Sequence, residues 1–205
     1  MISHALFIIQ RELADHLDSN YPGQHKVILG NLSEGFGQSA GNVARDSTVL
    51  SVINIKEEKA LKNIPNYVRD DIKLTAKYQN PPVFINMLVL MTATHSNYTI
   101  ALSTLSRAIR FFQHKNVFTH DNVIPAALTD PTIHELDRFE TFKLIFDLYS
   151  PSLEESNHMW GTLGGKQYPS VVYMVRMLDL KFNAVESERG LISEVRNEFF
   201  HLHLP

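Results

Sequence analysis

The most strongly apolar stretch of the chain lies near its middle, over Pro82–Met91. Both alternating sets of side chains in it are largely apolar: Val83, Ile85, Met87, Val89 and Met91 on one side, and Phe84, Leu88 and Leu90 on the other. A strand that is apolar on both faces is usually covered on both, in the middle of a sheet. We therefore predict that Pro82–Met91 is the central strand of the fold.

A helix is predicted after this strand, because the apolar residues change to a helical spacing. Ser96 or Asn97 can cap its first turn, since a short side-chain oxygen accepts hydrogen bonds from the free N–H groups there. The apolar stripe of this helix consists of Tyr98, Ala101, Leu102, Leu105, Ala108, Ile109 and Phe112. Strand and helix together form the predicted folding nucleus.

The N-terminal third begins with an amphipathic helix, predicted over Ser3–Ser19 with Ser3 as a candidate cap. The sequence Tyr21-Pro22-Gly23 ends it, because proline cannot continue a helix and glycine accepts a positive φ. The segments that follow are a short strand over His25–Gly30, a glycine-rich mobile loop over Asn31–Asp46 and a second strand over Thr48–Lys56.

The second half contains two further predicted strands. The first is Phe139–Ser150, in which Phe142, Leu144, Phe146 and Leu148 share one face. Ser152 is expected to cap a short helix that Gly161–Gly165 terminates, and Tyr168–Phe182 is the last strand. The segment Asn116–Arg138 is predicted to be irregular. This order of elements favours an α+β fold, with helices packed on one mixed β-sheet over residues 1–182 and a tail or arm over residues 183–205.

The connection Glu57–Asn80 is long for a compact domain, which is typical of a functional or disordered segment. Leu74–Tyr78 can pair with an upstream segment as a protruding hairpin. A lid, a subunit-contact arm and an unstructured linker all fit the length, and its apolar residues favour the contact arm. The candidate interface residues in this arm are Tyr67, Ile72, Leu74 and Tyr78.

Composition narrows the classes of function. The 19 basic and 22 acidic residues give a formal charge of −3, without a basic stripe, which disfavours binding to nucleic acid or to an anionic membrane. The absence of cysteine excludes disulfides, thiolate metal sites and cysteine nucleophiles. Arg11, Glu12 and Asp15 interrupt the apolar N-terminus, so we expect neither a signal peptide nor membrane insertion, and a protein that folds in the cytoplasm.

The sequence contains two partial matches to functional motifs, and neither meets the requirements of its site. Gly161-Thr162-Leu163-Gly164-Gly165-Lys166 superficially resembles a phosphate loop, but its spacing is too short and Gln167 replaces the magnesium-binding hydroxyl. Glu155 and His158 share a helix face, but a di-iron site needs a second such pair and two further carboxylates. The sequence therefore predicts no enzyme activity, no metal site and no cofactor. A hydrolase using histidine and carboxylate stays a less favoured alternative.

Trp160 is the only tryptophan in the chain, and it lies on the predicted short helix. It is either a core anchor or an interface residue, since tryptophan is enriched at interface hot spots. We include His158, Trp160, Gly164 and Gly165 among the interface candidates. Phe199 and Phe200 are added because the apolar end of the tail has no evident place in the predicted nucleus.

Several segments, taken together, resemble one family. They are ISHALFIIQRELADHL, VILGNLSEG, VLSVINIKEEKALKN, NPPVFINMLVLMTATHSNYTIALSTLSRAIRFFQHKNVFT and LEESNHMWGTLGGKQYPSVVYMVRMLDL. In this order and spacing they are similar to the cap, or tail-terminator, proteins of phage-tail-like extracellular contractile injection systems, of the Photorhabdus virulence cassette and antifeeding prophage type. The resemblance covers most of residues 1–182.

The resemblance implies a structural protein with a fold similar to phage tail terminators. Such a protein forms a hexameric ring on the distal end of the inner tube and the sheath, stops their polymerisation and fixes the particle length. The implied partners are further copies of the chain, the inner tube protein and the sheath protein. The alternative within the same particle is a baseplate or tube-adaptor component. The particle is assembled in the cytoplasm and is either released or anchored.

Overall fold

A computed structural model of the protein describes residues 1–23, 25–35, 43–61, 63, 65–78, 80–129, 132–139, 141–180, 187–191 and 194–196. The helices are α1 (Ile2–Asn20), α2 (Tyr98–His114), α3 (Pro125–Leu128) and α4 (Leu153–Thr162). Short 3-10 turns are η1 (Leu32–Glu34), η2 (Lys59–Leu61) and η3 (Glu135–Asp137). The strands are β1 (Val27–Leu29), β2 (Thr48–Glu57), β3 (Tyr67–Asp70), β4 (Thr75–Tyr78), β5 (Val83–Ala93), β6 (Val117–Thr119), β7 (Lys143–Tyr149), β8 (Ser170–Leu180) and β9 (Ser187–Gly190).

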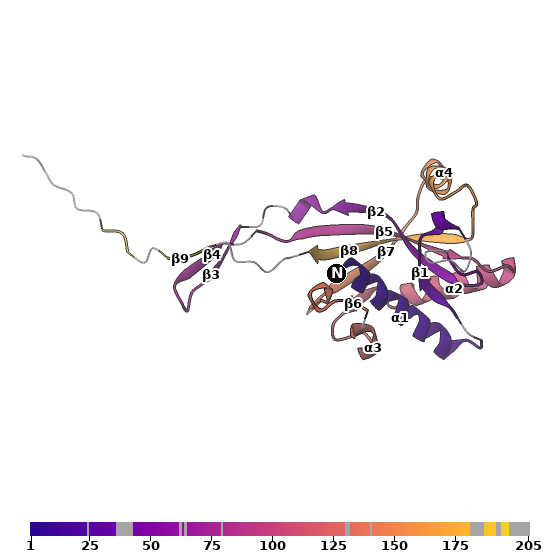
Figure 1. Ribbon diagram of the computed structural model, residues 1–205, viewed down its shortest axis with the longest axis horizontal. Coiled ribbons are helices and arrows are strands. Elements are labelled where there is room, and N and C mark those ends of the chain that lie inside the picture. The colour runs from indigo at the N-terminus through magenta and orange to yellow at the C-terminus, as the bar shows by residue number, and fades with distance from the viewer. Residues whose placement is uncertain are drawn as a thin grey trace, which may run out of the picture.

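Six strands form one large sheet in the order β1-β2-β5-β8-β7-β6, and three form a small sheet in the order β3-β4-β9. The large sheet is mixed, because β1 and β2 are parallel whereas the other pairs are antiparallel. The small sheet projects from one end of the large one as an extended arm (Figure 1). The predicted α+β class with a mixed sheet is confirmed.

The predicted central strand is confirmed as β5, which lies between β2 and β8. Met87 and Met91 are fully buried on one face of it, and Leu90 is fully buried on the other. Burial on both faces is the reason that both alternating sets of side chains are apolar. A bulge between Ile85 and Met87 shifts the pairing with β8 at the end nearer the arm.

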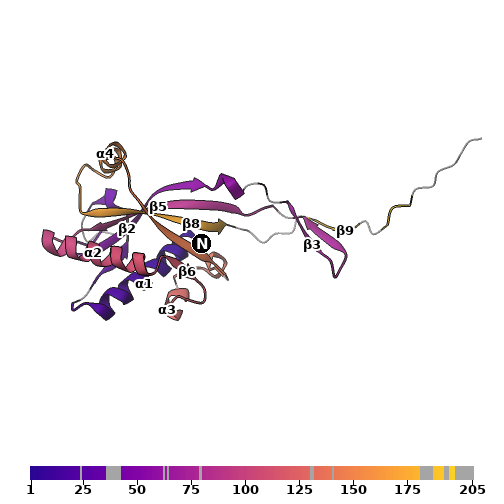
Figure 2. The ribbon, with the colours of Figure 1, turned by 180° about the vertical axis from the view of Figure 1, so that it is seen from behind.

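Two hydrophobic clusters lie on the two faces of the large sheet. The larger is formed with α1, α2 and α3, and it contains aromatic contacts such as the stacked rings of Phe112 and Phe146, 4.9 Å apart. The smaller lies under α4 on the opposite face and consists of Leu32, Val43, Val49, Leu90, Trp160 and Val172. Figures 1 and 2 show α4 alone above the sheet and the other helices below it.

Two of the three predicted helix N-terminal caps are confirmed. Asn97 caps α2 by accepting from the N–H groups of Thr99 and Ile100, and Ser152 caps α4 in a reciprocal capping box with Glu155. The prediction for Ser3 is wrong, because α1 begins at Ile2 and its N-terminus has no side-chain cap. The helix therefore depends on its buried face for stability.

Long-range contacts order two segments that were predicted to be irregular. Asn116–Arg138 contains β6, α3 and η3, and Lys115, directly before it, binds Glu12 of α1. The predicted loop Asn31–Asp46 contains η1 and the buried Leu32 and Val43. The strand predicted from Phe139 begins only at Lys143, because the N–H of Phe139 donates to Nδ1 of buried His4, 3.0 Å away, instead of to a strand.

The predicted hairpin in Glu57–Asn80 is confirmed as β3 and β4, joined by a turn at residues 71–74. Residues 187–191 of the predicted tail also belong to the arm. There β9 pairs antiparallel with β4, and the N–H of Leu191 donates to the carbonyl of Leu74 at 2.8 Å. The arm is therefore built from two segments far apart in the sequence (Figure 2).

Candidate interaction surfaces

The arm presents apolar side chains to solvent. Ile72 at its turn is 96% exposed, Leu74 is 55% exposed, and Tyr67 on β3 is 48% exposed. The half-buried Tyr78 on β4 lies opposite Tyr67, with ring centroids 6.2 Å apart. Exposed apolar residues gathered on one projecting element are typical of an interaction surface.

The turn of the arm has a defined conformation. The carboxylate of Asp70 accepts hydrogen bonds from the backbone N–H groups of Lys73 and Ile72, and these bonds lower the pKa of Asp70 below its usual range. Leu74 has a positive φ of 50°, which bulky residues rarely adopt. The carboxylate cap and the bond from Leu191 to the Leu74 carbonyl hold the turn in this shape.

Trp160 lies inside the molecule, only 6% exposed, in the smaller hydrophobic cluster. Its ring faces that of Tyr168 at 6.3 Å. In the isolated chain it therefore anchors α4 to the sheet, as the first of its two interpretations requires. The second interpretation, in which Trp160 contacts another subunit, stays a prediction.

Gly164 and Gly165 end α4 in a Schellman arrangement. The N–H of Gly165 donates to the carbonyl of Trp160 at 2.8 Å, while Gly164 and Gly165 have φ values of 98° and 75°. Only glycine adopts such angles without strain, so these two residues are explained by helix termination. Gly161, expected in the terminating turn, is part of the helix instead.

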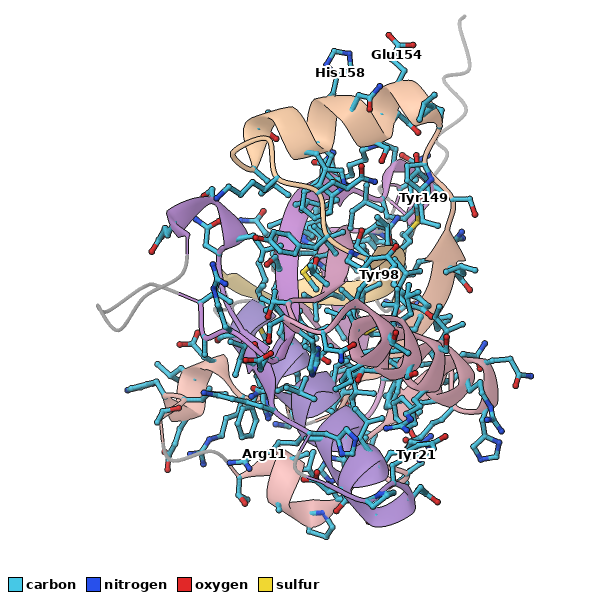
Figure 3. All side chains as sticks on the ribbon, turned by 90° about the vertical axis from the view of Figure 1, so that its right-hand side faces the viewer. Arg11, Tyr21, Tyr98, Tyr149, Glu154 and His158 are labelled. Carbon is cyan, nitrogen blue, oxygen red and sulfur yellow. The ribbon has the colours of Figure 1, made fainter. Side chains whose placement is uncertain are left out.

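His158 lies on the outer face of α4, where its side chain is 80% exposed (Figure 3). Its Nε2 is 3.8 Å from a carboxylate oxygen of Glu154 on the preceding turn, an exposed pair that contributes little to stability. The predicted interface residues Phe199 and Phe200 lie outside the described residues.

The structure contains one surface that the sequence analysis missed. A groove of about 760 Å³ lies between α2, α4 and the end of β7. Leu148 of β7 was predicted to share one face with Phe142, Leu144 and Phe146, but unlike these buried residues it is 58% exposed. Tyr98 and Leu102 of α2 are 66% and 42% exposed. The apolar stripe of α2 is thus wider than the surface it buries. This excess width of the apolar stripe was the signal in the sequence from which the exposed surface could have been predicted.

Chemistry-bearing side chains do not converge in the described part of the chain. No three histidine, aspartate or glutamate residues there are close enough to hold a metal ion. The helices among the described residues include none that is long and apolar enough to cross a membrane.

Comparison with solved structures defines the class of fold. The chain is similar to a chain in the extended-state structure of the sheath/tube terminator of PVC, an extracellular contractile injection system, with a TM-score of 0.63 and 14% identity over 99% of this chain and 64% of that one. It is also similar to the tube terminating cap of the anti-feeding prophage, with a TM-score of 0.57 and 13% identity over 93% of this chain and 60% of that one. The fold is that of these terminators, and the chain spans less than two thirds of either.

A family model narrows this assignment. The model described as the Pvc16 N-terminal domain matches residues 7–194, and the chain belongs to this family. The resemblance to cap proteins predicted from the sequence is confirmed by this match. Among curated proteins none matches the sequence.

Proposed function

We propose that this chain is the sheath/tube terminator, or cap, of an extracellular contractile injection system. The observation that carries the proposal is the likeness over 99% of the chain to the PVC sheath/tube terminator. The match to the Pvc16 N-terminal domain over residues 7–194 supports it independently of the fold. Its role is structural, without catalysis or a cofactor.

The proposed assembly is a hexameric ring on the distal end of the inner tube and the sheath. A closed ring requires an interface between two different surfaces of the same chain. The arm supplies one such surface, because it extends away from the core and carries exposed apolar residues. The ring binds the last tube and sheath layers, offers no surface for a further layer, and so fixes the particle length.

Deleting the gene tests the proposal. Particles from the deletion strain are expected to vary widely in length, because tube and sheath polymerisation loses its stop. Complementation with the full chain restores one uniform length, as measured by electron microscopy of purified particles. Uniform, unchanged lengths without the chain contradict the proposal.

The same particles distinguish a cap from a baseplate or tube-adaptor component. An epitope-tagged chain is expected at the end of the particle opposite the baseplate, where immunogold labels it. Labelling at the baseplate assigns the chain to the alternative class. Labelling along the whole sheath contradicts both assignments.

A further inference from the structure

A short stretch of the large sheet has no strand neighbour on its outer side. β6 pairs only with the first part of β7, from Lys143 to Ile145. The last outward bond runs from the N–H of Phe146 to the carbonyl of Asn116, at 2.8 Å. Because the backbone groups of an antiparallel strand point alternately to its two sides, the next outward-facing N–H and C=O belong to Leu148. In the described part of the chain β7 has no further strand on this side.

This free edge borders the groove between α2 and α4. Leu148 and Tyr149 are consecutive strand residues, so their side chains point to opposite faces of the sheet. Tyr149 points toward α4, where its hydroxyl donates to Glu155 at 3.1 Å, and Leu148 lies on the α2 side with Tyr98 and Leu102. Figure 3 shows Tyr149 close to α4 and Tyr98 at α2. We name this site the β7 slot, consisting of Tyr98, Leu102, Leu148, Tyr149 and Met159.

The chemistry of the β7 slot defines its partner. A free strand edge binds an extended segment through backbone hydrogen bonds, and pockets on either side select alternate side chains. The side chains that line the groove are apolar or uncharged. The partner must therefore be a strand with two consecutive apolar residues, one for the α2 side and one for the α4 side. A charged residue at either of these two positions would lose its hydration without compensation.

We propose that the β7 slot receives strand β3 of a second copy of this chain. β3 is an edge strand of the small sheet, with β4 as its one strand neighbour among the described residues. Its consecutive residues Tyr67 and Val68 are 48% and 52% exposed and point to opposite faces. Tyr67 and Val68 precede the charged Arg69 and Asp70 of the same strand. The other edge strand of the small sheet, β9, has the sequence Ser-Glu-Arg-Gly, which lacks two consecutive apolar residues and does not meet the requirement.

The positions of the two surfaces favour pairing between copies. The arm projects from one end of the large sheet, whereas α2, α4 and the end of β7 lie at the other (Figure 1). β3 therefore cannot reach the slot of its own chain. A contact between different surfaces of successive copies is heterologous, as a ring requires, and aromatic and β-branched residues pair well across strands. This inference rests on the proposed ring and assigns the surface that receives the arm.

Site-directed cross-linking tests the contact in the full chain, which contains no cysteine. The double variant Leu148→Cys/Val68→Cys, treated with a short bifunctional maleimide, is expected to give a covalent ladder of oligomers that ends at the ring size. An equimolar mixture of the two single variants is expected to give dimers and nothing larger. Each single variant alone is the matched control and stays uncross-linked. A double variant that gives no ladder overturns the inference.

A backbone variant separates strand pairing from simple apolar contact. Leu148→Pro removes the outward N–H but keeps the bonds of Asp147 and Tyr149 to β8, since proline is tolerated at a sheet edge with its nitrogen facing outward. We expect about a five- to tenfold loss in the association constant relative to Leu148→Ala, measured by analytical ultracentrifugation. Equal effects of the two variants overturn the strand-pairing inference.

The experiments distinguish failure of the β7 slot inference from failure of the cap proposal. Rings that form and cap particles without cross-linking between positions 68 and 148 exclude the β7 slot as the receiving site and leave the cap proposal intact. Particles of unchanged length in the deletion strain contradict the cap proposal, and then a ladder from the double variant still establishes the contact between copies.

Discussion

Buried Glu12 and half-buried Lys115 form an ion pair that joins α1 to the C-terminal end of α2. The ammonium of Lys115 donates to one carboxylate oxygen of Glu12 at 2.7 Å, and the other oxygen accepts from the N–H of Ile124 at 2.5 Å. Glu12 is only 5% exposed. One carboxylate thus connects the N-terminal helix, the central helix and the start of α3, three elements that cover the same face of the sheet.

Removing one partner of this pair is expected to destabilise the fold. Lys115→Met leaves the carboxylate of Glu12 buried without its counter-charge, so we expect a loss of about 3 kcal/mol in the free energy of unfolding. The double variant Glu12→Met/Lys115→Met is expected to lose less than the sum of the two single variants. Urea denaturation of the four proteins measures the coupling, and additive losses would show that the two side chains act independently.

Stability is expected to fall as the pH drops from about 7 toward 5. Burial, with further contributions from nearby positive charges, lowers the pKa of His4 below its usual value of 6.5. The unfolded chain therefore binds this proton at a higher pH than the folded chain does. The stability contributed by neutral His4 is complete above pH 6.5 and is lost as the pH falls from there toward the folded pKa. His16 and His95, whose pKa values burial also lowers, act in the same direction.

His4→Asn isolates the contribution of this one histidine. The Asn oxygen can replace Nδ1 as the acceptor for the N–H of Phe139 but cannot become charged. We expect a shallower slope of unfolding free energy against pH for the variant between pH 7 and 5, measured by urea denaturation at several pH values. A slope identical to that of the natural chain would contradict the assignment.

Trp160→Ala is expected to lower the free energy of unfolding by about 3–5 kcal/mol, because it leaves a cavity under α4. His158→Ala, on the outer face of the same helix, is the matched control and is expected to change stability by less than about 0.5 kcal/mol. Thermal unfolding measures the first effect. Assembly of the surviving folded fraction then tests the proposed interface role: full assembly by Trp160→Ala at low temperature favours a core role alone.

Shortening the arm is expected to abolish ring formation without unfolding the core. The N–H of Glu58 donates to the carbonyl of Phe84 at 2.8 Å, so the chain ends at these positions are adjacent and a short Asn-Gly turn can join β2 to β5. Replacing residues 60–81 in this way keeps the large sheet. Light scattering should then report a monomer, and thermal unfolding should show that the large sheet still unfolds cooperatively. A ring formed by this variant contradicts the role of the arm.

Deleting Asn183–Pro205 tests the hypothesis that the tail, which contains the interface candidates Phe199 and Phe200, contacts the sheath or a neighbouring subunit. The deletion removes β9, which pairs with β4, and we expect weaker ring formation and reduced sheath capping. Electron microscopy of complemented particles measures the length distribution. Unchanged rings together with unchanged lengths would defeat the hypothesis.

The central strand and its helix could be predicted because their signals are local. Met87 and Leu90 alternate on two buried faces, and Asn97 stands directly before the helix that it caps. By contrast, β6 and α3 depend on partners distant in the sequence. Phe118 of β6 pairs with Leu144 of β7, and Glu12 of α1 accepts from the N–H of Ile124 just before α3, contacts that no spacing along the chain encodes.

The interface candidates also divide into those with a local sequence signal and those that depend on distant partners. Ile72 and Leu74 were predicted to belong to a contact arm because the long connection is too apolar for a solvated linker. Both are exposed in the isolated chain, and their contact stays a prediction. Leu148 was predicted to share one face with Phe142, Leu144 and Phe146 because the alternation continues through it, but it alone of the four is exposed. Its exposure results from β6 ending opposite Ile145, and the position where a neighbouring strand stops cannot be derived from the pattern of β7 itself.

The arm also has a consequence for the timing of biosynthesis. Its first two strands end at Tyr78, but its third strand begins at Ser187, which is 187 − 78 = 109 residues later. Domains form progressively as the ribosome releases the chain. The three-stranded arm therefore cannot be complete until residue 190 has emerged, so an unfinished polypeptide lacks the finished arm and premature subunit association on the polysome is disfavoured.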